Sequence, residues 1–168
     1  MELRIATTWS GQAVGPDEQV VVGLHDDGDL VLSVQAPWHR DPLPDAPPGP
    51  VPGLWDHEVV ELFILGSDER YLEVELGPGG HHLVLRLEGR RQVLEQGLPL
   101  AAWARPVGDR WTAQARIPRS WLPPGPHRIN AYAIHGQGDQ RRYLAWSPTG
   151  GDAPDFHRLE AFRAVELP

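Results

Sequence analysis

Acidic side chains alternate with apolar ones in the middle of the chain, at a spacing that gathers several carboxyl groups on one surface. The stretch Arg70–Leu76 has this alternation, with Glu73 and Glu75 at every second position. Successive side chains of a strand point to opposite faces, so these two glutamates share a face. Glu61 joins them if the apolar residues of its own strand point into the core. Neighbouring carboxyl groups of this kind can bind hydroxyl groups or act as a general acid and base.

The next stretch, His82–Glu88, alternates leucines with polar residues. We expect its leucines in the core, which places His82 and Arg86 on the acidic face, and His135 converges there from a later strand. Cross-strand neighbours lie about 5 Å apart at Cβ, so the carboxylates should favour the charged imidazoles and raise the pKa of both histidines. The alternative is a solvated outer face whose charges protect the sheet.

Aromatic residues add a second set of candidates. The chain has 7 Trp, and Trp55 and Trp146 lie beside loops rich in Pro and Gly, where an aromatic ring can stack on a sugar. Core packing is the alternative for each of them. His157 completes the wall of the expected site.

A metal site is a further alternative. His82, His135 and His157 with one carboxylate could hold a divalent metal, calcium or zinc, although no local spacing requires it. The segment that starts at His57 lacks the second histidine of a zinc helix, and there is no phosphate-binding or dinucleotide-binding glycine motif and no serine-hydrolase motif. No other cofactor is expected.

The elements that must position these residues are short strands separated by turns. We predict a loop from Pro37 to Pro52, because its prolines can neither join a sheet ladder nor continue a helix, and one helical turn between Ile117 and Leu122. The expected strands are Leu3–Thr8, Gln19–Leu24, Leu30–Gln35, Glu58–Leu65, Arg70–Leu76, His82–Glu88, Ala101–Pro106, Trp111–Ile117, Arg128–His135, Tyr143–Trp146 and Leu159–Val165. Val93–Leu100 is ambiguous. The pattern is that of an all-β fold.

Composition narrows the function classes. The 168 residues suit a single domain, residues 1–168, and 18 Gly and 18 Pro suit many turns. A net charge of −8 argues against nucleic acid as a partner. There are no cysteines for disulfides or thiol catalysis. No apolar run approaches a membrane span and the N-terminus lacks a signal-peptide pattern, so we expect no membrane partner and a cytoplasmic location.

Several motifs resemble a known superfamily. Trp55-Asp56-x-Glu58, the stretch Tyr71–Leu76 and the stretch Trp111–Pro118 are similar to the type 9 carbohydrate-binding module and the related DOMON-like β-sandwiches. Further motifs that cover most of the chain resemble an uncharacterised family of small single-domain bacterial and vertebrate proteins. They are Ala36-Pro37, Asp41-Pro42, Leu54-Trp55-Asp56, His82–Leu85, Gly89-Arg90-Arg91, Ala133–Gly136 and Pro154–Phe162. The resemblance implies a two-sheet antiparallel β-sandwich, and paired tryptophans clamp a sugar in the carbohydrate-binding modules.

The residues and the resemblance together favour a binding domain for a small polar ligand, most plausibly a saccharide. The expected ligand-binding residues are Trp55, Glu61, Glu73, Glu75, His82, Arg86, His135, Trp146 and His157. The first alternative is an enzyme that uses the same cleft, either a carboxylate-based glycosidase or isomerase or a hydrolase with a histidine-bound metal. Glutamates buried in a pocket without an Arg partner would favour catalysis. The second alternative is an interaction module with an exposed sheet edge.

Overall fold

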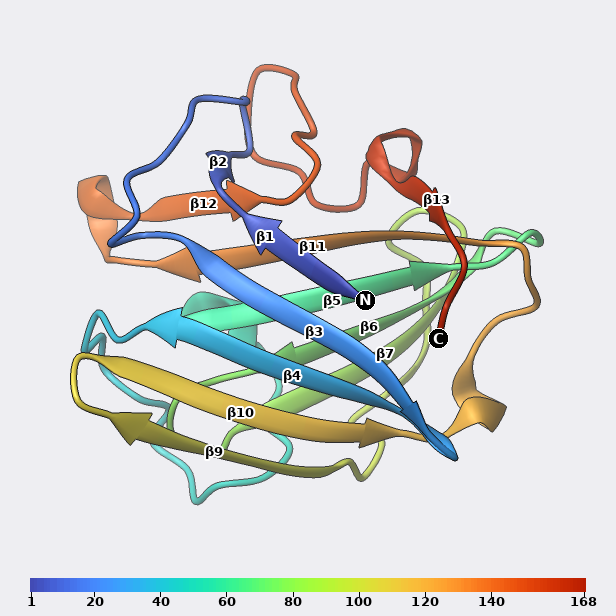
Figure 1. Ribbon diagram of the computed structural model, residues 1–168, viewed down its shortest axis with the longest axis horizontal. Helices are drawn as coiled ribbons and strands as arrows, with labels where there is room; N and C mark the ends of the chain where they lie inside the picture. Colours follow the sequence, from blue (N-terminus) through green and yellow to red (C-terminus); the bar gives the residue numbers. More distant parts are fainter.

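Two antiparallel sheets packed face to face form the computed structural model, which describes residues 1–168 (Figure 1). The smaller sheet has the order β1 (Glu2–Ile5), β3 (Val20–Asp27), β4 (Asp29–Pro37), β10 (Arg110–Ile117) and β9 (Ala101–Val107). The larger sheet has the order β2 (Thr7–Thr8), β12 (Arg142–Ala145), β11 (His127–His135), β5 (Val59–Leu65), β6 (Arg70–Leu76), β7 (His82–Glu88) and β8 (Val93–Gln96), with β13 (Arg163–Val165) also paired to β11. The predicted all-β, two-sheet antiparallel sandwich is confirmed.

The helical parts are four turns of 3-10 helix, η1 (Leu54–Asp56), η2 (Arg119–Trp121), η3 (Gly138–Gln140) and η4 (Leu159–Ala161). None is long and apolar enough to cross a membrane. η2 confirms the helical turn expected before the prolines at 123 and 124.

Several strand predictions need correction at their ends. The strand expected over Leu3–Thr8 is interrupted at Ala6, and its halves join different sheets, β1 in the smaller and β2 in the larger. The ambiguous segment after β7 contains β8, a short strand at the open edge. The strand expected over Leu159–Val165 is divided between η4 and β13. By contrast, β6 and β7 have the predicted bounds.

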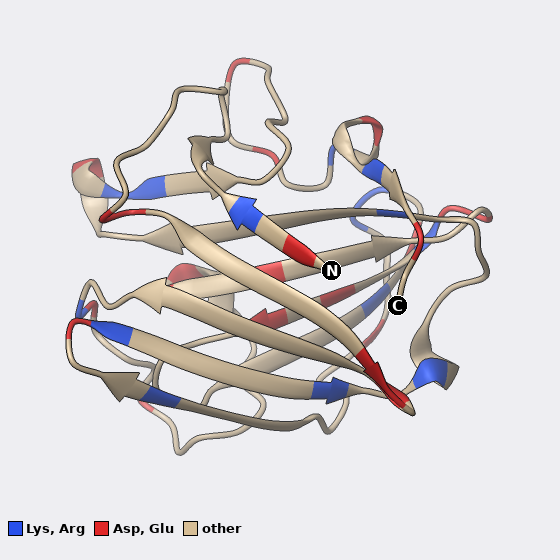
Figure 2. Cartoon of the chain, in the orientation of Figure 1, with Lys and Arg blue, Asp and Glu red and all other residues tan.

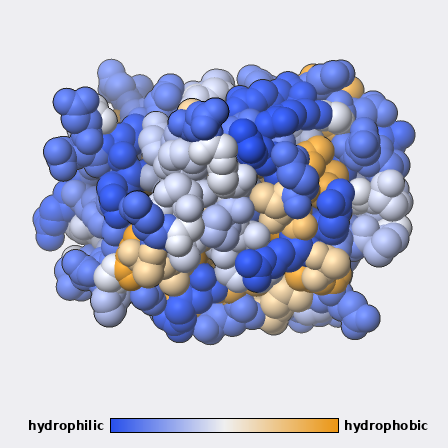
Figure 3. Space-filling model, turned by 90° about the horizontal axis from the view of Figure 1, so that it is seen from above, coloured by the Kyte–Doolittle hydropathy of each residue, from blue (hydrophilic) through white to orange (hydrophobic).

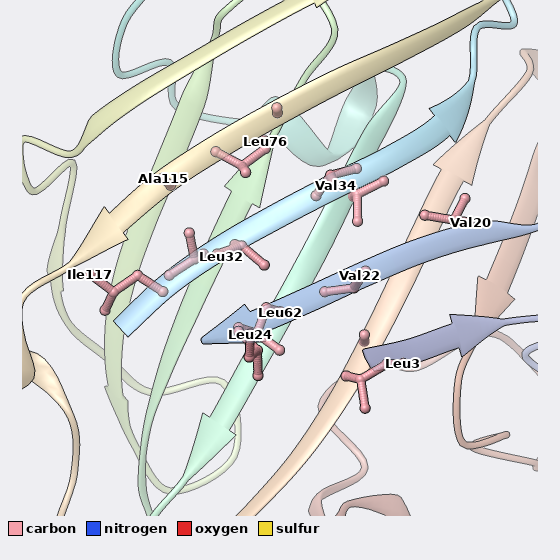
Figure 4. Packing of buried hydrophobic residues seen from close by; sticks show 14 of the residues in the cluster. Leu3, Val20, Val22, Leu24, Leu32, Val34, Leu62, Leu76, Ala115 and Ile117 are labelled. Atoms are coloured by element: carbon pink, nitrogen blue, oxygen red, sulfur yellow. The ribbon is translucent and has the colours of Figure 1, made fainter. Parts of the chain in front are cut away.

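The main core fills the space between the sheets (Figure 4). It contains 26 buried residues, including Leu62, Leu72, Val74 and Leu76 from the larger sheet. Figure 4 shows two of them, Leu62 and Leu76, among side chains of the smaller sheet such as Leu24 and Leu32. The predicted inward face of β5 and β6 is therefore confirmed, and the opposite face of the same strands must carry the glutamates.

That opposite face is also buried, contrary to the expectation of a solvated surface. A second cluster of 13 buried hydrophobic residues covers it, built from β5, β6, β7 and β11 together with Leu54, Phe156 and Phe162 from the segments around η1 and η4. Figure 2 shows the acidic positions within β5 and β6, one of them at the arrowhead of β6. The glutamates are therefore enclosed between the larger sheet and the segments that cross it.

Glu58 ties the Pro-rich loop to both sheets. Its carboxylate is 4% exposed and accepts hydrogen bonds from the indole N–H of Trp111 in β10, at 3.1 Å, and from the backbone N–H groups of His39 and Asp41, at 3.1 and 3.4 Å. Burial raises the pKa of Glu58, and the backbone hydrogen bonds partly oppose it. Glu58 is thus a structural residue that anchors the start of the predicted long loop.

Two tryptophans of the sandwich are largely exposed. Trp55 in η1 is 43% exposed, and Trp103 in the edge strand β9 is 46% exposed. The surface seen from above is mostly hydrophilic with a few hydrophobic patches (Figure 3). The two side chains differ in their surroundings, because only Trp55 lies beside the cavity described below.

Candidate binding site on the outer face of the larger sheet

A cavity of about 440 Å³ lies over the outer face of the larger sheet. Small-molecule sites have volumes of roughly 300 to 1,000 Å³. The floor comes from β5, β6, β7 and β11, and the walls come from η1, β8, β12 and the segment before η4. The lining residues are Trp55, Glu61, Glu73, Leu85, Leu87, Arg91, Val93, Ile134, Tyr143, Pro154, Phe156 and His157.

Two carboxyl groups form the polar part of the floor, and a third lies beside them. Glu61 in β5 is directly opposite Glu75 in β6, and Glu73 is two residues away on the same face. Glu61, Glu73 and Glu75 are 3%, 4% and 0% exposed. Both oxygens of Glu75 and Oε2 of Glu73 are buried without a hydrogen-bond partner. Unpaired buried polar groups are costly, so such a cluster points to a ligand or a functional role.

Burial sets the protonation of these groups. It raises the pKa of Glu73 to about 7, although an interaction with Glu75 and the positive charge of Arg91 both act to lower this pKa. Burial, reinforced by the neighbouring glutamates, raises the pKa of Glu61 and of Glu75 well above the ordinary value. At neutral pH the site therefore holds protonated carboxyl groups, which can donate as well as accept hydrogen bonds.

Arg141 positions the exposed aromatic wall. Its guanidinium donates to the backbone carbonyls of Trp55, Asp56 and Gly136, at 2.5, 3.1 and 3.1 Å. The same guanidinium lies 5.8 Å from the ring centre of Tyr143. These contacts fix the backbone that carries the Trp55 side chain at the mouth of the cavity.

A hydrogen-bond chain orients His157, another lining residue of the cavity. The Tyr71 hydroxyl accepts the backbone N–H of Arg91 at 3.0 Å and lies 2.8 Å from Nδ1 of His157. Burial raises the pKa of Tyr71 to about 12 and lowers the pKa of His157 to about 4. The Tyr71 hydroxyl already accepts the Arg91 N–H, so its own proton is available to donate to Nδ1 of the neutral imidazole. In that tautomer His157 carries its proton on Nε2.

Two residues, Asp155 and Phe156, hold the segment before η4 in place. Asp155 accepts hydrogen bonds from Arg91, at 2.8 Å, and from Arg90. Burial would raise the pKa of Asp155, but these two arginines together lower it. The Tyr132 hydroxyl donates to the carbonyl of Phe156 at 3.0 Å, and the two rings stack with centres 3.9 Å apart. The wall is therefore built by the fold without a ligand.

Replacing Tyr71 with Phe is expected to lower the free energy of unfolding by about 1 to 2 kcal/mol, because the Arg91 N–H and the His157 ring each lose a partner in a buried setting. Chemical denaturation measures this change. Tyr143→Phe is the matched control, since the Tyr143 hydroxyl makes no hydrogen bond. Equal stabilities of the two variants would show that the Tyr71 hydroxyl does not hold the wall.

The structure brings together some of the predicted site residues and separates others. Trp55, Glu61, Glu73 and His157 line the cavity, and Glu75 lies next to Glu61 beneath it. The remaining predicted residues, His82, Arg86, His135 and Trp146, do not line it.

The predicted orientation of β7 is wrong. Glu73 lies opposite Leu85 and Glu75 opposite Leu83, so the leucines of β7 share the outer face with the glutamates. His82 and Arg86 consequently point to the inner face, and Arg86 forms an ion pair with Glu95. The leucine pattern misled the prediction because both faces of this sheet are buried.

His82 and His135 do not converge on the carboxyl cluster. Both ring nitrogens of His82 are buried without a partner. The His135 ring stacks on His39, with centres 3.5 Å apart, and its Nε2 lies 2.9 Å from Glu18. Burial lowers the pKa of both predicted histidines, and for His135 it outweighs Glu18, so the expected upward shift is wrong.

Trp146 also lies outside the site, and the three histidines expected to hold a metal are not gathered in one place. Trp146 packs against the main core, and Arg163 lies 5.2 Å from the centre of its ring. No three His, Asp or Glu side chains are arranged to hold a metal ion, so His82, His135 and His157 do not form one site.

Several site residues were not predicted to bind ligand. Arg91 and Phe156 belong to motifs that the sequence singled out, yet these motifs alone assign no role to them. Tyr143 lines the cavity from a strand expected only to be weak. What marks Arg91 and Phe156 as site residues is that they lie close together in space. This proximity depends on the contacts of Asp155, which join segments far apart in the sequence.

Comparisons with known proteins identify relatives across the whole chain. No family model matches. The chain is 42% identical over 177 residues to the human UPF0462 protein C4orf33, which covers 99% of this chain and 88% of the relative. It is 41% identical over 176 residues to the homologue from Danio rerio, covering 99% of this chain and 89% of the relative.

A solved structure supports the fold. The crystal structure of a candidate carbohydrate-binding protein from Bacteroides uniformis has a TM-score of 0.77 and 17% sequence identity, covering 100% of this chain and 86% of the other. This likeness shows the shared sandwich. Because the identity to the vertebrate relatives extends over nearly the full length of both chains, the protein belongs to the UPF0462 family.

Proposed function

We propose that the cavity on the outer face of the larger sheet binds a small saccharide. The observation that carries the proposal is that the exposed Trp55 and the buried carboxyl groups of Glu61 and Glu73 line one cavity of about 440 Å³. Aromatic rings pack against the apolar faces of sugar rings, and carboxyl groups bind hydroxyls. The candidate carbohydrate-binding protein with the same sandwich supports this assignment.

In this proposal the aromatic and polar groups have separate roles. Trp55 stacks on the sugar ring at the mouth, Glu61 and Glu73 bind hydroxyls on the floor, and Nε2 of His157 donates from the wall. The motif around Trp55 and Glu58 supports placing the sandwich among the DOMON-like folds related to the type 9 carbohydrate-binding module. Leucines and aromatic residues exclude water around these polar groups.

Replacing Trp55 with Ala is expected to weaken saccharide binding about tenfold or more, which corresponds to about 1.4 kcal/mol of lost stacking. Isothermal titration calorimetry with a panel of mono- and disaccharides measures the change. Trp103→Ala is the matched control, because Trp103 is equally exposed but lies on the edge strand of the other sheet. Equal losses in the two variants, or no saccharide binding by the native protein, would contradict the proposal.

A second candidate function is carboxyl-based catalysis on the bound saccharide. Glu61 and Glu73 line the cavity, and neither forms an ion pair with an arginine. Burial raises the pKa of both carboxyl groups, and that of Glu73 is raised to about 7. A group that titrates near neutral pH can give and take a proton during a reaction. A protonated neighbour could then serve as the acid.

Turnover separates the two candidates. If the site is catalytic, the native protein hydrolyses or isomerises at least one saccharide of the panel, and Glu61→Gln and Glu73→Gln each abolish that turnover while Glu166→Gln, at an exposed position outside the cavity, retains it. If every saccharide that binds is recovered unchanged after prolonged incubation, the site is a binding site without catalysis.

A further inference from the structure

The carboxyl cluster under the cavity has no cation paired with it. Glu61, Glu73 and Glu75 are at most 4% exposed, and Oε2 of Glu73 has no hydrogen-bond partner although its side chain lines the cavity. Three such groups could be neutralised by protons or by a cation that enters with the ligand. Removing charges from water is offset best by a close opposite charge.

The protein's own cations near the cavity are engaged elsewhere. The Arg91 guanidinium forms an ion pair with Asp155 at 2.8 Å, and the Arg141 guanidinium is hydrogen-bonded to three backbone carbonyls. Both act on the glutamates only at longer range, Arg141 on Glu61 and Arg91 on Glu73. Asp56 adds further negative charge near Glu75. A position for a cation in direct contact with the carboxyl groups is therefore left open.

The aromatic residues that line the cavity could also bind a cation. Trp55, Tyr143 and Phe156 line the cavity, and the face of an aromatic ring attracts ammonium groups within about 6 Å of its centre. Arg141 already occupies such a position relative to Tyr143, at 5.8 Å. Because the aromatic rings and the carboxyl groups of Glu61 and Glu73 line the same cavity, both kinds of group are available to an ammonium group bound there.

We propose that the ligand carries a protonated amine, which makes an amino sugar the preferred class of saccharide for this site. The inference rests on the proposed saccharide function. The ammonium group lies between the aromatic wall and the carboxyl groups of Glu61 and Glu73, while the hydroxyls reach His157. On binding, Glu73 loses its proton to solvent and forms an ion pair with the ammonium group.

The test compares matched ligands by isothermal titration calorimetry at about pH 6.5. The probes are D-glucosamine and D-galactosamine, their N-acetyl forms, D-glucose and D-galactose, and cyclohexylamine as an amine without hydroxyls. We expect at least one free amine to bind about tenfold more tightly than its neutral and N-acetyl counterparts. Titrations in two buffers of different ionisation enthalpy should show release of more than about half a proton per ligand.

Variants locate the effect in the cluster. Glu73→Gln should reduce the ratio of amine to neutral affinity about tenfold, because a Gln amide cannot carry the balancing charge. Glu166→Gln, at an exposed position near the C-terminus, should leave the ratio unchanged.

Each outcome decides between the claims. Neutral sugars that bind as tightly as the amines, without proton release, would overturn the amine inference and leave the saccharide function standing. Binding of cyclohexylamine without binding of any sugar would overturn the saccharide function and support the cation site. If none of the probes binds, both claims fail.

Discussion

The Glu73→Gln variant is expected to gain stability relative to the native protein by about 3 kcal/mol as the pH rises from 4.5 to about 7.5. In the unfolded chain Glu73 ionises near pH 4.5, whereas in the folded chain burial raises its pKa to about 7. Between these values the unfolded state has released the proton that the folded state still holds. Stability from Glu73 is therefore fully present below pH 4.5 and is lost as the pH rises to about 7, whereas Gln does not ionise.

Chemical denaturation of both proteins at several pH values measures this difference. Subtracting the two curves removes contributions from groups whose pKa does not depend on Glu73, including His157, whose pKa of about 4 makes stability rise with pH in the acidic part of the range. Glu166→Gln provides an exposed control. A difference between Glu73→Gln and the native protein that stays constant with pH would show that Glu73 ionises normally in the folded protein.

Replacing Glu58 with Ala is expected to lower the free energy of unfolding by about 3 to 5 kcal/mol. The substitution leaves the Trp111 indole and the N–H groups of His39 and Asp41 without their acceptor. Each buried donor left unsatisfied costs about 1 to 3 kcal/mol, and the lost side chain adds a cavity.

Graded variants test this explanation of Glu58. Glu58→Gln keeps one acceptor oxygen and should cost less than Glu58→Ala. Trp111→Phe removes only one of the three donors, although it also loses buried ring volume. If Glu58→Ala lowers the free energy of unfolding by less than about 1 kcal/mol, the carboxylate does not anchor the loop.

Much of the fold could be predicted from the sequence because short-range signals define it. The alternation in Arg70–Leu76 and the turn residues beside it set the bounds of β6 correctly. The break at Ala6 was not predictable in the same way, since the residues on either side of it have the same strand preference. It arises because the chain passes from one sheet to the other, which is a tertiary constraint.

The site was predictable only where it depends on the alternation of side chains along β5 and β6. Glu61, Glu73 and Glu75 share a face because of period-2 geometry, and that prediction is confirmed. The orientation of β7 was not predictable from alternation, because a sheet buried on both faces has apolar residues on both. The Asp155 contact with Arg91 joins residues 64 positions apart, so no local pattern could place Phe156 and His157 over the cavity.

An NMR titration tests the location of the ligand site most directly. Backbone and indole ¹H–¹⁵N spectra are recorded while D-glucosamine, N-acetyl-D-glucosamine and D-glucose are added in turn. We predict that at least one sugar shifts the Trp55 indole signal and the amides of Glu73 and residues 155–157 in a saturable way, while the Trp103 indole signal stays in place. Shifts confined to other parts of the sandwich, or no saturable shift with any of the three sugars, would contradict a saccharide site in this cavity.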